Sequence, residues 1–242
     1  MFRSIAFVWA LAAGAAHAAD DVQALLKAAD RWRLSGDSMQ VETLVQTFHK
    51  DGSPDKERRY TVFAQPQRRS LVLMRSPAEA GQKVLMLGDD FWLLMPSSQR
   101  PLRITPMQKL LGDASTGDIA TLSWADDYTG SVAGEEPCGP QSCTRLSLQA
   151  TRKGASYQRI ELWIGKQRRE PVQAELYVQS DKLAKHAQFL LDKGGKEVAE
   201  MVLQDRLSSH KSTHVRYLSR QQRSVPEAWL NPMFLARNPA LE

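Results

Sequence analysis

Long apolar runs are almost absent from this sequence. The longest candidate lies near the N-terminus, from Ile5 to Ala16, and has about 12 residues, whereas a helix that spans a bilayer needs about 20. No later segment is long and apolar enough to cross a membrane. We therefore do not expect a transmembrane helix, and a retained membrane anchor is the alternative interpretation.

The N-terminal run has the features of a secretory signal peptide. An arginine precedes it, and the triplet AHA at its end has the small-x-small pattern of a cleavage site. No cysteine follows the run, so nothing marks the mature N-terminus for lipidation. We predict a signal peptide over residues 1–19, cleaved near Ala18 or Ala19. Residues 20–242 are then expected to form a single domain in the periplasm.

Cysteine is also scarce. The two cysteines, Cys138 and Cys143, both lie in the segment CGPQSC. A redox-active pair prefers a two-residue spacer at the start of a helix, and neither feature is present. Gly139-Pro140 can bend the chain enough to bring the two sulfurs together. Because export implies an oxidising compartment, we predict a structural disulfide that closes a local loop.

Motifs for catalysis and metal binding are missing. The sequence has no His-Glu-x-x-His motif, Gly-x-Ser-x-Gly elbow, phosphate-binding loop or dinucleotide fingerprint. The acidic pair Asp126-Asp127 precedes a predicted strand and fits a cap or turn better than a catalytic pair. The mature chain's histidines are interpreted as surface residues; they are His49, His186, His210 and His214. We predict a binding protein without catalysis, cofactor or metal site, with an exported hydrolase as an alternative.

Charge of one sign does not dominate. The chain has 32 Lys and Arg against 27 Asp and Glu, and removal of one arginine with the signal peptide leaves a mature net charge of about +4. The basic residues are dispersed in pairs such as Arg58-Arg59 and Arg168-Arg169, without the interleaved aromatic residues of a nucleic-acid surface. We expect a solvated surface and no nucleic-acid partner.

Helical periodicity is strongest just after the predicted cleavage site. In residues 20–33, apolar side chains recur at helical spacing, with acidic residues in the first turn and arginines in the last. From residue 39 onward strand patterns dominate, and in the second half turn signals are separated by segments of about 10 to 14 residues. These patterns predict a mainly β (α+β) fold, a strongly curved antiparallel sheet with an N-terminal helix.

Two short helices are predicted in the middle of the chain. Thr105 can cap a helix over residues 106–112, and Ser115 or Thr116 can cap a second helix that continues to Trp124. Both are too short to be stable alone, so each must lie against an apolar surface.

The hairpin VLMLGDDFWLLMP, residues 84–96, has two apolar strands without polar alternation. In a hairpin with one solvent-exposed face, apolar and polar residues alternate along each strand. Because this hairpin lacks that alternation, both of its faces must be covered. A strongly curved sheet has a concave side that its own side chains cannot completely fill, and the short helices can cover that side as a lid. A dry cavity under a lid suits an acyl chain. A fully packed core without a cavity is the alternative.

The expected site consists of apolar side chains. The cavity residues are Met39, Val41, Val45, Val62, Val72, Met74, Leu85, Leu87, Trp92 and Leu94, and the lid residues are Met107, Leu110, Leu111, Ile119 and Leu122. A one-residue error in strand parity moves a whole set to the other face of the sheet.

The order of these segments resembles the LolA-like outer-membrane lipoprotein-sorting proteins, which are periplasmic carriers of acylated proteins. The resemblance runs through the N-terminal helix, the strand MQVETLVQTF, the segment RRSLVLMRSPAEAGQKVLMLGDDFWLLMP and the segment ASTGDIATL. It implies an open half-barrel of about eleven strands with short lid helices. It also implies that residues 183–191 and 196–203, whose apolar spacing fits a helix or a strand, are strands.

The resemblance also implies a function. The expected protein is a periplasmic carrier that shuttles acyl chains of a lipoprotein or lipid towards the outer membrane as a monomer. Its partners would be an inner-membrane transporter of the ABC or RND type and an outer-membrane acceptor. Arg68 or Arg69 falls where the family has a basic residue that holds the lid. A lipid-sensing regulatory protein that partners a membrane protein is the alternative.

Overall fold

The computed structural model describes residues 22–34, 36–120, 123–205 and 212–241. The predicted signal peptide and its cleavage site lie outside these residues. Within the described part of the chain, no helix is long and apolar enough to cross a membrane. The predicted N-terminal helix is present over residues 22–30 and continues as turns to residue 33.

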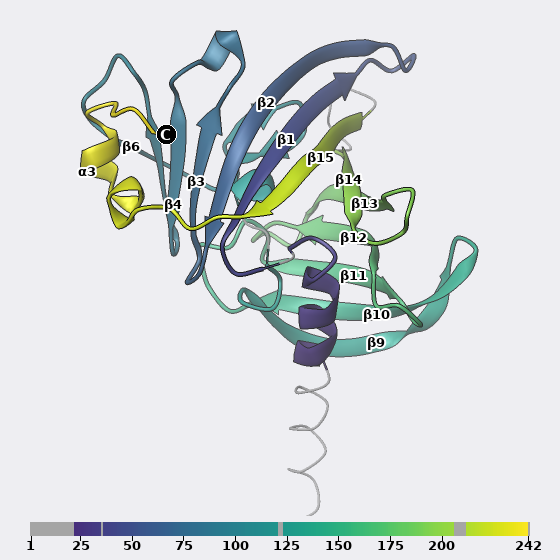
Figure 1. Ribbon diagram of the computed structural model, residues 1–242. Helices are drawn as coiled ribbons and strands as arrows, with labels where there is room; N and C mark the ends of the chain where they lie inside the picture. Colours follow the sequence, from purple (N-terminus) through teal and green to yellow (C-terminus); the bar gives the residue numbers. More distant parts are fainter. Residues whose placement is uncertain (1–21, 35, 121–122, 206–211, 242) are drawn as a thin grey trace, which may run out of the picture.

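One antiparallel sheet of 13 strands forms most of the molecule (Figure 1). Its first half comprises β1 (Met39–Phe48), β2 (Pro54–Gln65), β3 (Arg69–Met74), β4 (Lys83–Leu87), β5 (Asp90–Leu94) and β6 (Leu102–Ile104). Its second half comprises β9 (Tyr128–Cys138), β10 (Gln141–Ala150), β11 (Arg159–Gly165), β12 (Pro171–Tyr177), β13 (Leu183–Leu191), β14 (Val198–Gln204) and β15 (Ser212–Gln222). A short 3-10 helix, η1 (Pro77–Glu79), connects β3 to β4.

The sheet is a meander with one long-range junction. Neighbouring strands follow one another in sequence except β1 and β15, which pair in the middle of the sheet with Val45 opposite Val215. β6 and β9 form the two edges of the strand order, so the sheet is open rather than a closed barrel. The predicted fold class, a mainly β fold in which a strongly curved antiparallel sheet forms an open half-barrel with an N-terminal helix, is confirmed. The sheet has 13 strands, whereas the family resemblance implied about eleven.

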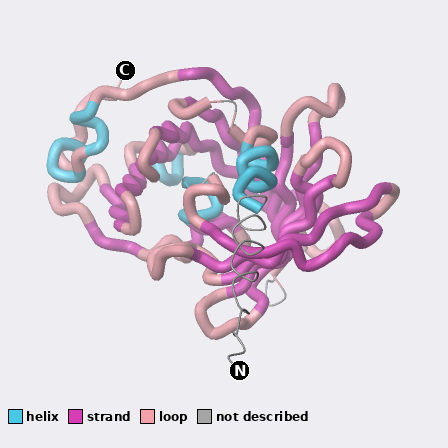
Figure 2. Tube along the Cα trace, turned by 90° about the horizontal axis from the view of Figure 1, so that it is seen from below, coloured by secondary structure: helices cyan, strands magenta, loops and turns pink. Residues whose placement is uncertain are grey.

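The sheet curves around the N-terminal helix. Figure 2 views the molecule from the end where this helix lies and shows strands on both sides of it. The β1–β15 and β9–β10 pairs each contain an irregularity in register, and such bulges increase the local bend and twist of a strand. Leu26 and Ala29 of the helix are fully buried in the same apolar cluster as Val45 of β1. The concave face of the sheet and the helix therefore share one core.

Side chains of β3 and β4 alternate between two apolar clusters. Val72 and Met86 join the cluster on the concave face, whereas Leu71 and Leu85 join a second cluster on the opposite face. This alternation explains the hairpin without polar positions, because both faces of its strands are covered.

The C-terminal segment covers the second cluster. After β15 the chain forms η2 (Glu227–Leu230) and α3 (Pro232–Leu235), drawn in yellow beside β4 and β6 in Figure 1. Trp229 and Leu235 of this segment are buried, and Trp229 packs edge to face on Phe63 of β2 with ring centroids 5.5 Å apart. Asn231 accepts hydrogen bonds from the first backbone N–H groups of α3, which is the usual role of an N-cap.

The segment between β6 and β9 is an insert that does not join the large sheet. We call residues 105–120 and 123–127 the insert; it contains β7 (Lys109–Leu111), β8 (Ala114–Ser115) and α2 (Thr116–Ala120). The predicted helix over residues 106–112 is wrong, because Leu111 pairs with Ala114 in a small hairpin. Gly112, with a φ of +56°, allows the tight turn between them. The second predicted helix is present as α2 but does not extend to Trp124.

Two segments of ambiguous periodicity are strands. Leu183–Leu191 forms β13, and Val198–Gln204 forms β14. The implication of the family resemblance is confirmed here, and the helical alternative is wrong. Along β13 every second side chain from Lys185 to Phe189 is buried, which is the period of a strand with one face against the core.

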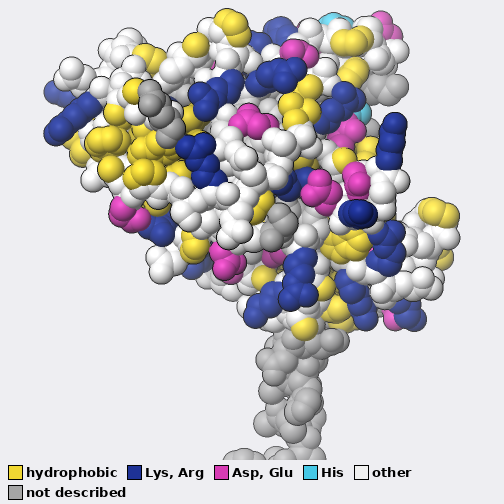
Figure 3. All heavy atoms as spheres, viewed as in Figure 1, with side chains coloured by type: hydrophobic (Ala, Val, Ile, Leu, Met, Phe, Trp, Pro, Cys, Tyr) yellow, Lys and Arg dark blue, Asp and Glu magenta, His cyan; other side chains and the backbone are white. Residues whose placement is uncertain are grey.

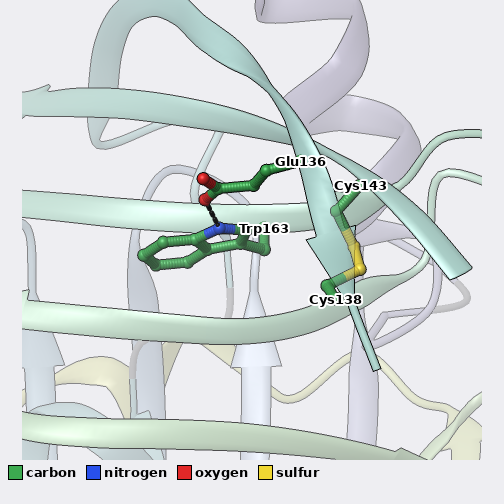
Figure 4. The surroundings of a disulfide bond; sticks show 4 residues. All are labelled: Glu136, Cys138, Cys143 and Trp163. Carbon is green, nitrogen blue, oxygen red and sulfur yellow. Dashed lines mark hydrogen bonds between the residues drawn. A yellow bond between two sulfur atoms is a disulfide. The ribbon is translucent and has the colours of Figure 1, made fainter. Parts of the chain in front are cut away.

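The disulfide predicted from the CGPQSC segment is present. Cys138 ends β9 and Cys143 lies near the start of β10, with their Cα atoms 5.8 Å apart. Figure 4 shows Trp163 of β11 near this bridge, donating its indole N–H to Glu136. The bridge, with Trp163 and Val172, forms a small apolar cluster of its own. It therefore fixes a local turn and lies apart from the main core.

Surface charge is dispersed, as the sequence indicated. Figure 3 shows Lys and Arg side chains spread over the visible face, while apolar side chains gather where α3 and β6 lie. Leu102 and Met233 are exposed apolar residues of these two elements.

Candidate functional site

The concave face brings together six of the ten predicted cavity residues. Met39, Val41, Val45, Val62, Val72 and Met74 all belong to the cluster under the N-terminal helix and the insert. Each is at most 5% exposed. Their role as a binding surface stays a prediction, because in this conformation other protein side chains cover them.

The other four predicted residues lie on the opposite face. Leu85, Leu87, Trp92 and Leu94 pack with the C-terminal segment rather than with the concave cluster. In β4 and β5 the concave positions are held instead by Val84, Met86 and Phe91. The prediction for β4 and β5 was therefore wrong by one residue. A run of consecutive apolar residues does not show which side chains lie on which face of the sheet.

The insert lies over the concave cluster. Ile119 of α2 is 2% exposed, and Met107, Leu110 and Leu111 pack partly buried against the same cluster. Leu122, also predicted in the lid, lies outside the described residues. The predicted lid residues that are described therefore share one location, although a hairpin and one helix hold them instead of two helices.

A buried ion pair fixes α2 to the second half of the sheet. The Asp118 carboxylate accepts hydrogen bonds from Lys185 Nζ of β13 at 2.6 Å and from the Tyr157 hydroxyl at 2.7 Å. It also accepts the backbone N–H of Ser115 at 2.8 Å and the Ser115 hydroxyl at 2.7 Å, which fixes the side chain to the start of the helix. Burial alone would raise the pKa of Asp118, but Lys185 and the hydrogen-bond donors outweigh burial and lower the pKa.

Asp30 fixes the other end of the insert to the N-terminal helix. Its carboxylate accepts hydrogen bonds from the Ser123 hydroxyl at 3.0 Å and from the backbone N–H groups of Trp124 and Ala125 at 2.9 Å. Burial raises the pKa of Asp30, and Arg33 and these donors only partly oppose the rise. We call these contacts the Asp30 latch.

The two candidate lid-holding arginines have different partners. Arg68 is buried and forms an ion pair with Asp127 of the insert, and Asp89 lies 3.6 Å from the same guanidinium. Arg69 donates instead to Glu227 of the C-terminal segment at 2.6 Å. Only Arg68 contacts the insert, so the geometry favours Arg68 for the predicted role.

Two hollows lie on either side of the Asp30 latch. The outer cleft has a volume of about 780 Å³ and is lined by the end of the N-terminal helix, the β2–β3 turn and residues 123–127. The inner cavity, of about 50 Å³, lies between the insert and strands β11–β14. Ser123 lines both. The latched segment therefore separates the cleft from the cavity.

Apart from Arg68, sequence reasoning missed the polar residues that fix the insert. One signal was present for Lys185, because it occupies the same strand face as Ala187 and Phe189 in an otherwise apolar row. Ser115 and Asp118 also have the spacing of a capping box. Nothing in the sequence shows that Asp30, in an amphipathic helix, meets a segment more than ninety residues later.

A serine, a histidine and a glutamate meet on the convex face. Ser212 Oγ lies 3.0 Å from His214 Nε2, and His214 Nδ1 contacts Glu200. This order of atoms is that of a hydrolase triad. Glu200 also accepts from Arg216, and neither the outer cleft nor the inner cavity includes any of these residues.

Among the described residues, no group of three or more His, Cys, Asp or Glu could hold a metal ion.

Solved structures share this architecture over nearly their whole length. A LolA superfamily protein from Nitrosomonas europaea is 29% identical, with a TM-score of 0.78 over 86% of this chain and 96% of that chain. A DUF1329 family protein from Desulfovibrio piger is 20% identical, with a TM-score of 0.70 over 88% and 97%. A structure described as an outer membrane lipoprotein-sorting protein domain from Vibrio parahaemolyticus is 17% identical, with a TM-score of 0.69 over 92% and 100%.

The open curved sheet, the helix within it and these similarities define a LolA-like fold. The two structures with lower identity support the fold alone. A family model described as "Uncharacterized protein" matches residues 66–237, and the chain belongs to that family. A search of curated proteins finds no match.

Proposed function

We propose that this protein is a periplasmic carrier that binds the acyl chains of a lipid or lipoprotein in its concave interior. It would move them from an inner-membrane transporter of the ABC or RND type towards an outer-membrane acceptor. It would act as a monomer and without a catalytic step. Its similarity to the LolA superfamily protein of 29% identity supports this proposal.

One observation supports the proposal most directly. The concave apolar face is covered by a separate insert that a few polar contacts hold at defined points, namely Asp118, the Asp30 latch and Arg68. An insert held in this way can swing aside while the sheet stays intact.

The energetics suit reversible binding. Each buried methylene contributes about 0.8 kcal/mol, so an acyl chain that replaces the insert against the concave cluster offsets the broken contacts. In the present conformation the inner cavity, at about 50 Å³, is too small for such a chain. Binding therefore requires displacement of residues 123–125, which would join the cavity to the outer cleft.

The test is recovery of bound lipid. The mature protein is purified without detergent and extracted for lipid mass spectrometry, and uptake of a fluorescent fatty acid is measured in parallel. We expect at least one acylated compound at close to stoichiometric amount, and saturable uptake. Absence of both results would contradict the proposal. Co-purification with a single-span regulator rather than a transporter would support the sensor alternative.

A further inference from the structure

Arg33 is a buried arginine whose side chain has no hydrogen-bonding partner among the residues that the structure describes. It lies just after the N-terminal helix and is 6% exposed. Its Nε atom is fully buried and unpartnered, and its guanidinium donates to no described residue. The group lies over the Trp124 ring, 4.1 Å from the centroid, and 5.9 Å from that of Phe189. These rings interact with the positive charge but leave the Nε–H donor unused.

The carboxylates near Arg33 are committed to other donors. Asp30 accepts from Ser123, Trp124 and Ala125. Asp118 accepts from Lys185, Tyr157 and Ser115. The negative charge of Asp30 therefore partly balances the positive charge of Arg33, but the two side chains do not form a direct ion pair. Buried charges in proteins are normally paired and hydrogen-bonded, so an arginine in this state is expected to meet an acceptor from elsewhere.

The cavity beside Arg33 has both polar and apolar lining residues, as an amphipathic ligand requires. Arg33 lines the inner cavity together with Ser123 and with Asp118, whose carboxylate is paired with Lys185. Apolar side chains such as Ile160, Leu176 and Met201 form another part of the lining. The volume of about 50 Å³ holds one or two water molecules. Since Ser123 also lines the outer cleft, release of the Asp30 latch would place Arg33 at the junction of the two hollows.

We propose that Arg33 recognises the anionic head group, a carboxylate or phosphate, of a ligand whose acyl chain lies along the apolar wall. This inference rests on the proposed function and specifies its ligand. The planar guanidinium is suited to a carboxylate or phosphate, because its parallel N–H groups can bind two oxygens at once. The head group would stay near the cleft and the chain would extend towards β11–β14.

The experiment compares three ligands with the same chain. Equilibrium dialysis of the delipidated mature protein measures binding of palmitate, hexadecyl phosphate and 1-hexadecanol below their micelle concentrations. We expect palmitate, hexadecyl phosphate or both to bind at least about tenfold more tightly than hexadecanol, because a charge-assisted hydrogen bond gives discrimination of that order. Preference for only one anion would identify the head group as a carboxylate or a phosphate.

Arg33→Met should remove the preference and leave hexadecanol binding unchanged. Arg103→Met is the matched control, because Arg103 also lies over a tryptophan ring, that of Trp92, but on an exposed strand outside both hollows. Arg33→Lys, which keeps the charge but not the paired donors, should retain part of the preference. If Arg33→Met does not fold, the ligand comparison is made with Arg33→Lys and the unmodified protein, and it decides whether Arg33 recognises the head group.

Equal binding of all three ligands, or an unchanged preference in Arg33→Met, would overturn the inference while supporting the proposed function. A loss of hexadecanol binding in Arg33→Met equal to that of the anions would also overturn it, because Arg33 would then act only in packing. Binding of none of the three ligands would contradict both proposals.

Discussion

Lys185 Nζ lies 2.6 Å from the Asp118 carboxylate, and the side chains of the two residues are 2% and 3% exposed. This pair connects α2 of the insert to β13, across the interior of the half-barrel. A buried pair contributes little net stability when intact, but removal of one partner leaves an uncompensated charge.

Lys185→Met is therefore expected to lower the free energy of unfolding by about 3–5 kcal/mol at pH 7, measured by urea denaturation. The double variant Asp118→Asn with Lys185→Met should recover part of this loss, because no isolated charge remains. A loss below about 1 kcal/mol in the single variant would show that water reaches the pair.

The pair also predicts a pH dependence. The pKa of Asp118 in the folded protein lies below its ordinary value of 3.8. Its stabilising contribution is therefore complete above pH 3.8 and is lost as the pH falls towards the folded-state pKa. Urea titrations between pH 2 and pH 7 should show a steeper acid loss for the wild type than for the double variant. Parallel curves would contradict the prediction.

The Asp30 latch should control the mobility of residues 123–125. Asp30→Ala leaves two backbone N–H groups without their acceptor, so we expect a stability loss of about 1–3 kcal/mol. Faster hydrogen exchange should be confined to the amides of Trp124, Ala125 and their neighbours. Asp30→Asn is the control, since its amide oxygen can still accept. Exchange that rises equally throughout the sheet would argue against a local latch.

Asp30 has the opposite sign of pH dependence from Asp118. Because burial raises the pKa of Asp30 above 3.8, its contribution to stability is complete below pH 3.8 and is lost as the pH rises through the folded-state pKa. The stability of the wild type relative to Asp30→Asn should therefore fall as the pH increases above about 3.8. Denaturation curves of both proteins between pH 3 and pH 7 measure this difference. A constant difference would contradict it.

Arg68 and Arg69 should differ strongly although they are adjacent. Arg68→Met leaves the buried Asp127 without its ion-pair partner and is expected to cost about 3–5 kcal/mol. Arg69→Met removes a pair with Glu227, which is 79% exposed, and should cost at most about 1 kcal/mol. Hydrogen exchange should change at residues 123–128 in the first variant and near residue 227 in the second. Equal effects would contradict the assignment of Arg68 to the insert.

The C-terminal cover should support stability without affecting the ligand. Trp229→Ala opens the cluster on the convex face and is expected to lower the free energy of unfolding by about 3–5 kcal/mol. Because Trp229 lies on the other face from the inner cavity, the dissociation constant for palmitate should stay within about twofold, measured below the unfolding temperature. A large change would place the ligand on the convex face.

Ser212 tests the hydrolase alternative. Its geometry with His214 and Glu200 is that of a triad, but we interpret it as a surface hydrogen-bond network. We expect the wild type and Ser212→Ala to be equally inactive on p-nitrophenyl esters of short and long acids. Turnover in the wild type that Ser212→Ala abolishes would assign a catalytic role to this group.

Apolar periodicity predicted the meander but not which side chains of the β4–β5 hairpin lie on the concave face. In β1 the alternation of Val41 and Val45 with polar residues sets the parity, and these residues lie on the concave face as predicted. In β4 every position from Val84 to Leu87 is apolar, because the concave cluster covers one face and Trp229 and Leu235 cover the other. Parity there depends on a segment more than one hundred residues away, and local sequence does not contain that information.

The insert shows a second limit of local sequence. The apolar spacing of Met107, Leu110 and Leu111 fits a helix, but Gly112 turns the chain so that Leu111 meets Ala114. The choice is set by long-range contacts, since the backbone N–H of Asp113 donates to Thr213 of β15 at 2.8 Å. Tertiary packing therefore outweighs propensity in a segment too short to form a helix alone.

The pairing of β1 with β15 has a consequence for the order of folding. The first strand of the chain obtains its second neighbour only when the last strand is available, with nearly the whole domain between them. Such high contact order slows folding, and until then β1 and β14 each present an unpaired edge. An incompletely folded chain therefore exposes these two edges and is prone to association. Deletion of β15 would leave β1 and β14 without their shared neighbour and would divide the large sheet into two parts.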